Sequence, residues 1–140
     1  VHHWGQDGVL ICYGALLDAC FAAREKLARE GVDVGVINAR FVKPLDHALI
    51  QRALRECPFV VTIEEGQLAC GFGSAVLEFA VDQGIDVRHL RRLGIPDLFV
   101  EHGERAELLA DLHLDHEGIV QACRELSRQV QLESGRATCR

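Results

Sequence analysis

The sequence contains no methionine, and its longest apolar runs, such as residues 9–13, are far shorter than the roughly 20 residues that cross a membrane. It has no basic cluster, and 15 lysines and arginines against 21 acidic residues give a net charge of −6. These absences exclude a membrane-spanning segment and argue against a nucleic-acid partner. No signal-peptide pattern is present. Because a reading frame starts with methionine and this chain starts with Val1, we expect a piece of a longer protein.

The low hydrophobicity and high net charge that mark a disordered chain are also missing. Apolar residues make up 49% of the sequence and charged residues 26%, which is the balance of an ordinary globular protein. At about 100–200 residues per domain, the 140 residues predict one domain. A domain of this size has a core large enough to fold without cross-links.

Cysteine pairs are missing as well, because none of the six cysteines belongs to a Cys-x-x-Cys motif. Cys12, Cys20 and Cys123 fall in apolar runs or stripes, where a thiol packs as a small apolar side chain. His113 and His116 have no cysteine pair to complete the spacing of a zinc site. We therefore expect six reduced cysteines, no metal site and a cytoplasmic protein.

What the sequence does contain is an alternation of short apolar runs with helical patterns. We expect strands at residues 9–13, 34–42, 59–63 and 87–93, and helices at 15–30, 46–57, 74–84, 104–112 and 115–131. Asp46 and Asp115 are the expected N-caps. This order predicts a largely parallel sheet with helices on both faces. Residues 1–8 are interpreted as a linker, residues 9–131 as the domain, and residues 132–140 as a frayed tail.

No complete nucleotide-binding motif follows the first strand. Residues 14–17 read Gly-Ala-Leu-Leu, which lacks both the glycine spacing of a dinucleotide site and the Lys-Ser/Thr of a phosphate loop. Gly71, Gly73 and Ser74 form half of such a fingerprint after the third strand. The favoured interpretation is a tight turn into a helix with Ser74 as its cap; the alternative is a backbone anion site.

Two groups of polar residues are the remaining candidates. Glu64 and Glu65 are adjacent, so at a strand end their side chains point to opposite sides and do not act on one bond together. Either both belong to a solvated loop spanning residues 64–73, or one of them faces the crevice at the carboxyl end of the sheet. Arg88, Arg91 and Arg92 are expected in ion pairs first and as an anion site second. The residues alone therefore predict an α/β domain without a complete active site.

Three stretches taken together resemble a known family. They are Asn-Ala-Arg-Phe-Val-Lys-Pro-Leu-Asp at 38–46, Thr-Ile-Glu-Glu at 62–65 leading to Gly-Phe-Gly-Ser-Ala-Val at 71–76, and Gly-Ile-Pro-Asp-Leu-Phe-Val-Glu-His-Gly at 94–103. In this order they resemble the C-terminal domain of the 1-deoxy-D-xylulose-5-phosphate synthase family. The first two are shared with transketolases and 2-oxo-acid dehydrogenase β subunits, and the third is specific to the synthases. Cys70 departs from the family, where many members carry glycine.

The resemblance implies a three-layer α/β/α domain with a mostly parallel five-stranded sheet, in which one strand is antiparallel. The sequence shows four strands clearly, so we expect the fifth near residues 98–100. It implies a dimeric transferase that uses thiamine diphosphate and Mg²⁺ to join pyruvate and glyceraldehyde 3-phosphate with loss of CO₂, for isoprenoid synthesis. The cofactor is expected on the other domains, so this piece is expected to bind none and to be inactive alone. Its partners would be those domains and the second subunit.

No catalytic, cofactor or metal ligand is transferred to this sequence by the resemblance. The residues expected to form an interface or ligand loop are Arg40, Lys43, Glu64, Glu65, Gly71, Gly73, Ser74, Asp97, His102 and Gly103. Two alternatives stay open at this stage. One is the C-terminal domain of another transketolase-type enzyme or of a 2-oxo-acid dehydrogenase β chain. The other is an independent binding module with residues 64–73 as its ligand loop.

Overall fold

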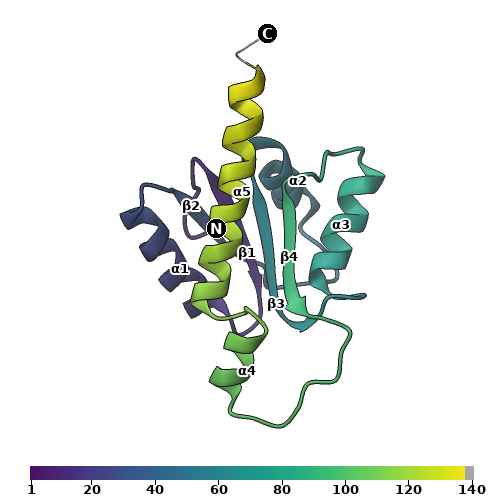
Figure 1. The fold of residues 1–140 in the computed structure, drawn as a ribbon. Coiled ribbons are helices and arrows are strands. Elements are labelled where there is room, and N and C mark those ends of the chain that lie inside the picture. The colour runs from purple at the N-terminus through teal and green to yellow at the C-terminus, as the bar shows by residue number, and fades with distance from the viewer. Residues whose placement is uncertain (138–140) are drawn as a thin grey trace.

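Four segments rich in apolar residues form a parallel sheet in the computed structural model, which describes residues 1–137 (Figure 1). The strands are β1 (Gly8–Tyr13), β2 (Val34–Asn38), β3 (Val60–Gln67) and β4 (Leu90–Ile95). They lie in the order β2-β1-β3-β4, and each neighbouring pair is parallel. All four strands therefore end at the same edge of the sheet, which we call the carboxyl edge.

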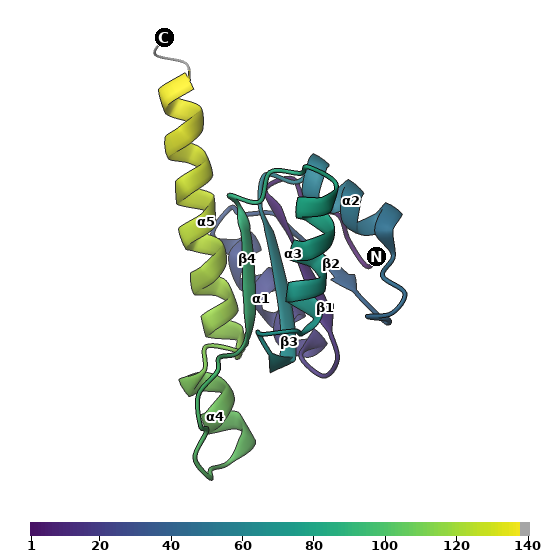
Figure 2. The same cartoon turned by 90° about the vertical axis from the view of Figure 1, so that its right-hand side faces the viewer.

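Helices cover both faces of this sheet, as the alternating sequence predicts. One face carries α1 (Leu17–Arg29) and α5 (His116–Ala137), and the other carries α2 (His47–Glu56) and α3 (Phe72–Asp82) (Figure 2). The short α4 (Arg105–Asp111) lies beyond the carboxyl edge (Figure 1). Asp46 and Asp115 cap α2 and α5 as expected, accepting hydrogen bonds from the N–H groups of Leu49 and Gly118.

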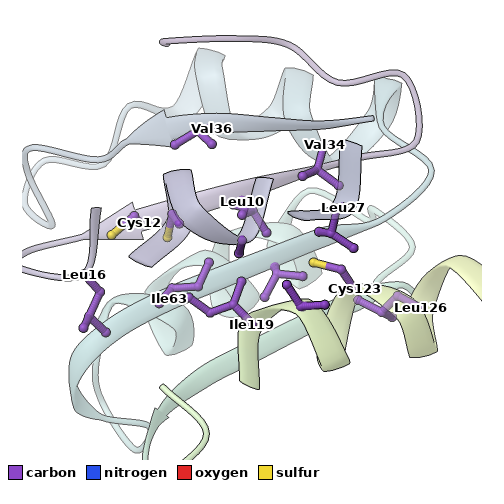
Figure 3. Packing of buried hydrophobic residues seen from close by; sticks show 14 of the residues in the cluster. Leu10, Cys12, Leu16, Leu27, Val34, Val36, Ile63, Ile119, Cys123 and Leu126 are labelled. Carbon is purple, nitrogen blue, oxygen red and sulfur yellow. The ribbon is translucent and has the colours of Figure 1, made fainter. Parts of the chain in front are cut away.

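The two halves of the core follow from the two-residue period of the strands. Leu10 and Cys12 point toward α1 and α5, where Cys20 and Cys123 join the same cluster (Figure 3). Val9 and Ile11 point toward α2 and α3. Burial raises the pKa of the Cys123 thiol to about 12, so this thiol stays protonated at neutral pH. The five cysteines within the described residues are free, and Cys139 lies outside them.

Residues 1–7, which the sequence predicts as a linker, pack along the outer edge of β2. His3 forms an antiparallel bridge with Val36 of β2, and Nε2 of His3 lies 3.1 Å from Oδ1 of Asp33. A Cβ at Gly5 would lie 2.2 Å from the backbone nitrogen of Gly35, so the two segments touch closely. Within residues 1–137 the sheet has four strands rather than the five that the resemblance implies, and this isolated bridge is the antiparallel contact at its edge. Residues 98–100, where we expected the fifth strand, are irregular.

The carboxyl-terminal helix also extends beyond its predicted end. Apolar periodicity stops near residue 131, but α5 continues to Ala137 and projects past the sheet (Figure 2). Leu132 is 67% exposed, because this part of the helix has left the core. The expected frayed tail is thus helical over residues 132–137, and residues 138–140 lie outside the described part of the chain.

Candidate functional site

The carboxyl edge gathers all the residues predicted to form an interface or ligand loop. Arg40 and Lys43 lie in the β2–α2 loop. Glu64 and Glu65 lie in β3, and the first turn of α3 and the residue before it carry Gly71, Gly73 and Ser74. Asp97, His102 and Gly103 lie in the β4–α4 loop, residues 96–104. Because the strands are parallel, segments far apart in the sequence meet at one edge.

Glu64 is buried, with 4% of its surface exposed. The strand β3 continues through it to Gln67, so the ten-residue loop predicted at 64–73 is shorter than expected. Its carboxylate turns toward α3 and accepts hydrogen bonds from the N–H groups of Phe72 and Gly73, both at 2.8 Å. These N–H groups would otherwise be free at the start of the helix. The carboxylate thus occupies the place where an anion would bind.

Glycines make the room for this carboxylate. A Cβ at Gly71 would lie 2.5 Å from Oε2 of Glu64 and 2.2 Å from the carbonyl oxygen of Gln67. Less severe approaches occur at Gly66, where a Cβ would lie 3.1 Å from Oε2, and at Gly94, where it would lie 3.2 Å from Cγ. The glycine-rich motif after the third strand therefore leaves space for the Glu64 side chain of the protein itself.

Ser74 does not cap α3, contrary to the sequence interpretation. The N-cap residue is Gly71, and the Ser74 hydroxyl instead donates to the carbonyl oxygen of Leu68 at 2.6 Å. Arg92 of β4 donates to the same carbonyl at 3.0 Å and to the Ser74 hydroxyl at 2.9 Å. The β3–α3 turn is thus held by hydrogen bonds from both Ser74 and Arg92, and these polar groups bind within the protein.

Glu65 points away from Glu64, which confirms the expected opposite orientation of the two neighbours. It accepts two hydrogen bonds from the Arg105 guanidinium of α4, at 2.9 and 2.5 Å. This hydrogen-bonded cation lowers the pKa of the Glu65 carboxyl. The pair connects β3 to the β4–α4 region but leaves no second carboxylate beside Glu64.

Arg88 and Arg91 form the ion pairs that the favoured interpretation predicts, whereas Arg92 binds neutral oxygen atoms instead. Arg88 pairs with Asp86 at 2.7 Å, and Arg91 pairs with Glu125 at 3.3 Å. Arg92 takes the Leu68 and Ser74 contacts described above. Sequence reasoning placed positive charge here but did not identify Arg92 and Arg105 as partners of the β3 region. Such pairings cross many residues, and no local signal in the sequence encodes them.

The β4–α4 loop differs sharply from the β3–α3 turn. Phe99 is 93% exposed and Leu98 is 56% exposed. Asp97, His102 and Gly103 are exposed too. Among residues 1–137, the Asp97 and His102 side chains have no hydrogen-bond or ion-pair partner. Leu98 and Phe99 are adjacent, and contiguous exposed apolar surface, unlike a single exposed side chain, is a feature of interaction sites.

No cluster for metal chemistry appears within the described residues, where no group of three or more His, Cys, Asp or Glu side chains converges. The single asparagine, Asn38, ends β2 and lines a hollow beside the β2–α2 loop. The site is therefore an edge of loops rather than a pocket of reactive groups.

Comparison with known proteins places this domain. The profile of the family "Transketolase, C-terminal domain" matches residues 1–119. The chain belongs to the transketolase C-terminal domain family. This membership agrees with the observed order of strands and helices and with the α/β fold that the sequence predicts.

Curated relatives of this chain include 1-deoxy-D-xylulose-5-phosphate synthases. A 1-deoxy-D-xylulose-5-phosphate synthase of Rhodopirellula baltica is 47% identical over 131 residues, covering 94% of this chain and 20% of the relative. The synthase of Geobacillus thermodenitrificans is 46% identical over 110 residues, covering 79% of this chain and 18% of the relative. This transketolase C-terminal domain thus spans about one fifth of the length of these curated relatives.

A solved structure supports the fold. "Split gene transketolase, inactive beta4 tetramer" superposes with a TM-score of 0.79 at 26% identity, covering 89% of this chain and 40% of that one. In the part of the chain that the structure describes, no helix is both long and apolar enough to cross a membrane.

Proposed function

We propose that this domain is the non-catalytic C-terminal domain of a cytoplasmic 1-deoxy-D-xylulose-5-phosphate synthase. That enzyme is a thiamine-diphosphate-dependent transferase that joins pyruvate to glyceraldehyde 3-phosphate with loss of CO₂, which supplies isoprenoid precursors. The proposal is supported by relatives of that name at 39–47% identity, which match most of this chain in their C-terminal region. Their shared name favours the synthase over a 2-oxo-acid dehydrogenase β chain.

The Glu64 contact is the observation that carries the non-catalytic assignment. A diphosphate with Mg²⁺ requires free N–H donors and oxygen ligands such as Asp and Asn. At α3 the donors are already bonded to Glu64, and at α2 Asp46 accepts the N–H of Leu49. The residues present therefore do not fit thiamine diphosphate, and we assign the cofactor and the reaction to the rest of the synthase.

The carboxyl edge is then the surface that faces the rest of the enzyme and its second subunit. Its exposed apolar side chains come from three different loops or strand ends and are Tyr13, Phe41, Leu98 and Phe99. Burial of such groups stabilises an assembly by about 25 cal/mol per Å² of apolar surface. An aromatic side chain at the centre of an interface contributes most.

Substitution of Phe99 in the full-length synthase tests this role. We expect Phe99→Ser to lower the fraction of assembled dimer in sedimentation velocity at low protein concentration and to lower kcat/KM with it. The matched control is Leu132→Ser, on the part of α5 that projects from the opposite end of the domain (Figure 1). Unchanged assembly and unchanged kinetics in Phe99→Ser would contradict the docking role.

A further inference from the structure

The β2–α2 loop, residues 39–46, borders a hollow that the fold does not fill. Its volume is about 610 Å³, and its apolar lining includes Ile37, Leu45 and Leu49. Phe41, on the same loop, is 67% exposed. Water-filled apolar surface of this extent is unfavourable unless another group covers it.

Two cations on this loop have no partner. Arg40 and Lys43 are exposed, and neither forms an ion pair or hydrogen bond with any residue from 1 to 137. Elsewhere most cationic side chains are paired. Lys26 with Glu117, Arg52 with Glu56, and Arg124 with Glu30 are examples. In a chain of net charge −6, two neighbouring unpaired cations are a distinct feature.

Backbone N–H groups of the loop are also available to a partner. The N–H groups of residues 40–43 donate no hydrogen bond within the described chain. The loop therefore offers donors, two positive charges and an apolar hollow at one place. A complementary surface would carry an apolar side chain next to a carboxylate.

The position of the hollow indicates the source of that surface. Val1 and His2 line it, together with the loop. The relatives match this chain over 20% of their length, in their C-terminal region, so about four fifths of a synthase would precede it. Polypeptide that joins the domain at Val1 is thereby brought to the mouth of the hollow.

We propose that this hollow receives an apolar side chain flanked by a carboxylate, contributed by the part of the synthase that precedes this domain, with Arg40 and Lys43 pairing to the carboxylate. The inference rests on the proposed function and adds the chemistry of the partner. It also distinguishes two contacts at the carboxyl edge: an electrostatically guided one at residues 40–43 and one through the apolar side chains of residues 98–99.

Hydrogen exchange in the full-length synthase is the first test. We expect the amides of residues 40–43 to exchange at least about 100-fold more slowly than unprotected amides. In the double variant Arg40→Glu/Lys43→Glu we expect exchange to return toward the unprotected rate. The matched control, Arg29→Glu/Arg55→Glu, makes the same change in charge at exposed positions away from the hollow and should keep the protection.

Zero-length cross-linking with a carbodiimide identifies the occupant. We expect Lys43 to be joined to an Asp or Glu that precedes this domain. A cross-link to another copy of residues 1–140, slow exchange without any cross-link from Lys43, or protection that appears only when inorganic phosphate is added would each overturn the proposal.

The same exchange data separate the two proposals. Rapid exchange at 40–43 together with protection at 98–102 would refute the occupied hollow and leave the docking domain intact. Rapid exchange in both segments would refute both.

Discussion

The β3–α3 turn and the β4–α4 loop lie at the same edge of the sheet, yet they use their side chains in opposite ways. At the turn, the side chain of Glu64 from β3 is 4% exposed, and both of its hydrogen bonds go to the protein's own backbone. In the loop, Phe99 is 93% exposed and contributes little to the core. The two sequence motifs that mark a site thus differ: one binds within the fold, and the other leaves its apolar side chains exposed, which is the basis for the docking role proposed above.

Removal of the Glu64 carboxylate should have the largest effect on stability. In Glu64→Ala the N–H groups of Phe72 and Gly73 lose their acceptor inside the protein, which costs about 3 kcal/mol of unfolding free energy. Glu65→Ala, the adjacent control, removes a partly exposed ion pair and should cost less than about 1 kcal/mol. Urea unfolding of the two variants measures the difference. Equal losses of unfolding free energy in the two variants would show that the Glu64 contact stabilises the fold no more than the Glu65 ion pair does.

Substitution of Gly71, which leaves space for Glu64, should have the next largest effect on stability. Gly71→Ala places a Cβ against the Gln67 carbonyl and the Glu64 carboxylate, and such overpacking costs about 2 kcal/mol. Gly135→Ala is the control, because a Cβ there meets nothing within 4 Å and removal of a helical glycine is expected to be neutral or slightly stabilising. Thermal unfolding followed by circular dichroism compares them. A Gly71→Ala variant as stable as Gly135→Ala would mean that Glu64 does not need this space.

Acidic pH should weaken the ion pair between Glu65 and Arg105, and we expect this effect on stability to be smaller. The hydrogen bond from Arg105 lowers the pKa of Glu65 in the folded state, so the pair contributes stability above the unfolded pKa of about 4.3. This contribution is lost as the pH falls through the folded pKa. We expect Arg105→Gln to unfold at a lower temperature than the parent at pH 7 and at nearly the same temperature at pH 3. A difference that persists undiminished at pH 3 would contradict the ion-pair explanation.

The sequence predicts the layers of the fold well, because buried strands and helix stripes have their own periods. Residues 9–13 and the helices that follow the strands are found near their expected positions. The apolar periodicity reports which residues are buried rather than which are helical or extended. It therefore ends where an element leaves the core, even though the helix or strand continues. This is why α5 continues to Ala137, and why β3 continues to Gln67 through polar residues.

The site was predictable as a location but less so as a set of contacts. Parallel strands brought all the candidate residues to the carboxyl edge, as the α/β order requires. The role of Glu64 depends on Phe72 and Gly73, eight and nine residues away, and that of Glu65 depends on Arg105, forty residues away. The pairing of His3 with Asp33 is of the same kind. Such contacts are set by tertiary packing and leave no pattern in a single sequence.

Calorimetric titration of this 140-residue chain with thiamine diphosphate and Mg²⁺ decides whether the domain holds the cofactor, once a cooperative thermal transition has shown that the chain is folded. Since Glu64 already occupies the helix N–H groups that would hold a phosphate, we predict no specific binding heat. Saturable one-to-one binding at micromolar concentration would place the cofactor site in this domain and contradict its assignment as a docking domain.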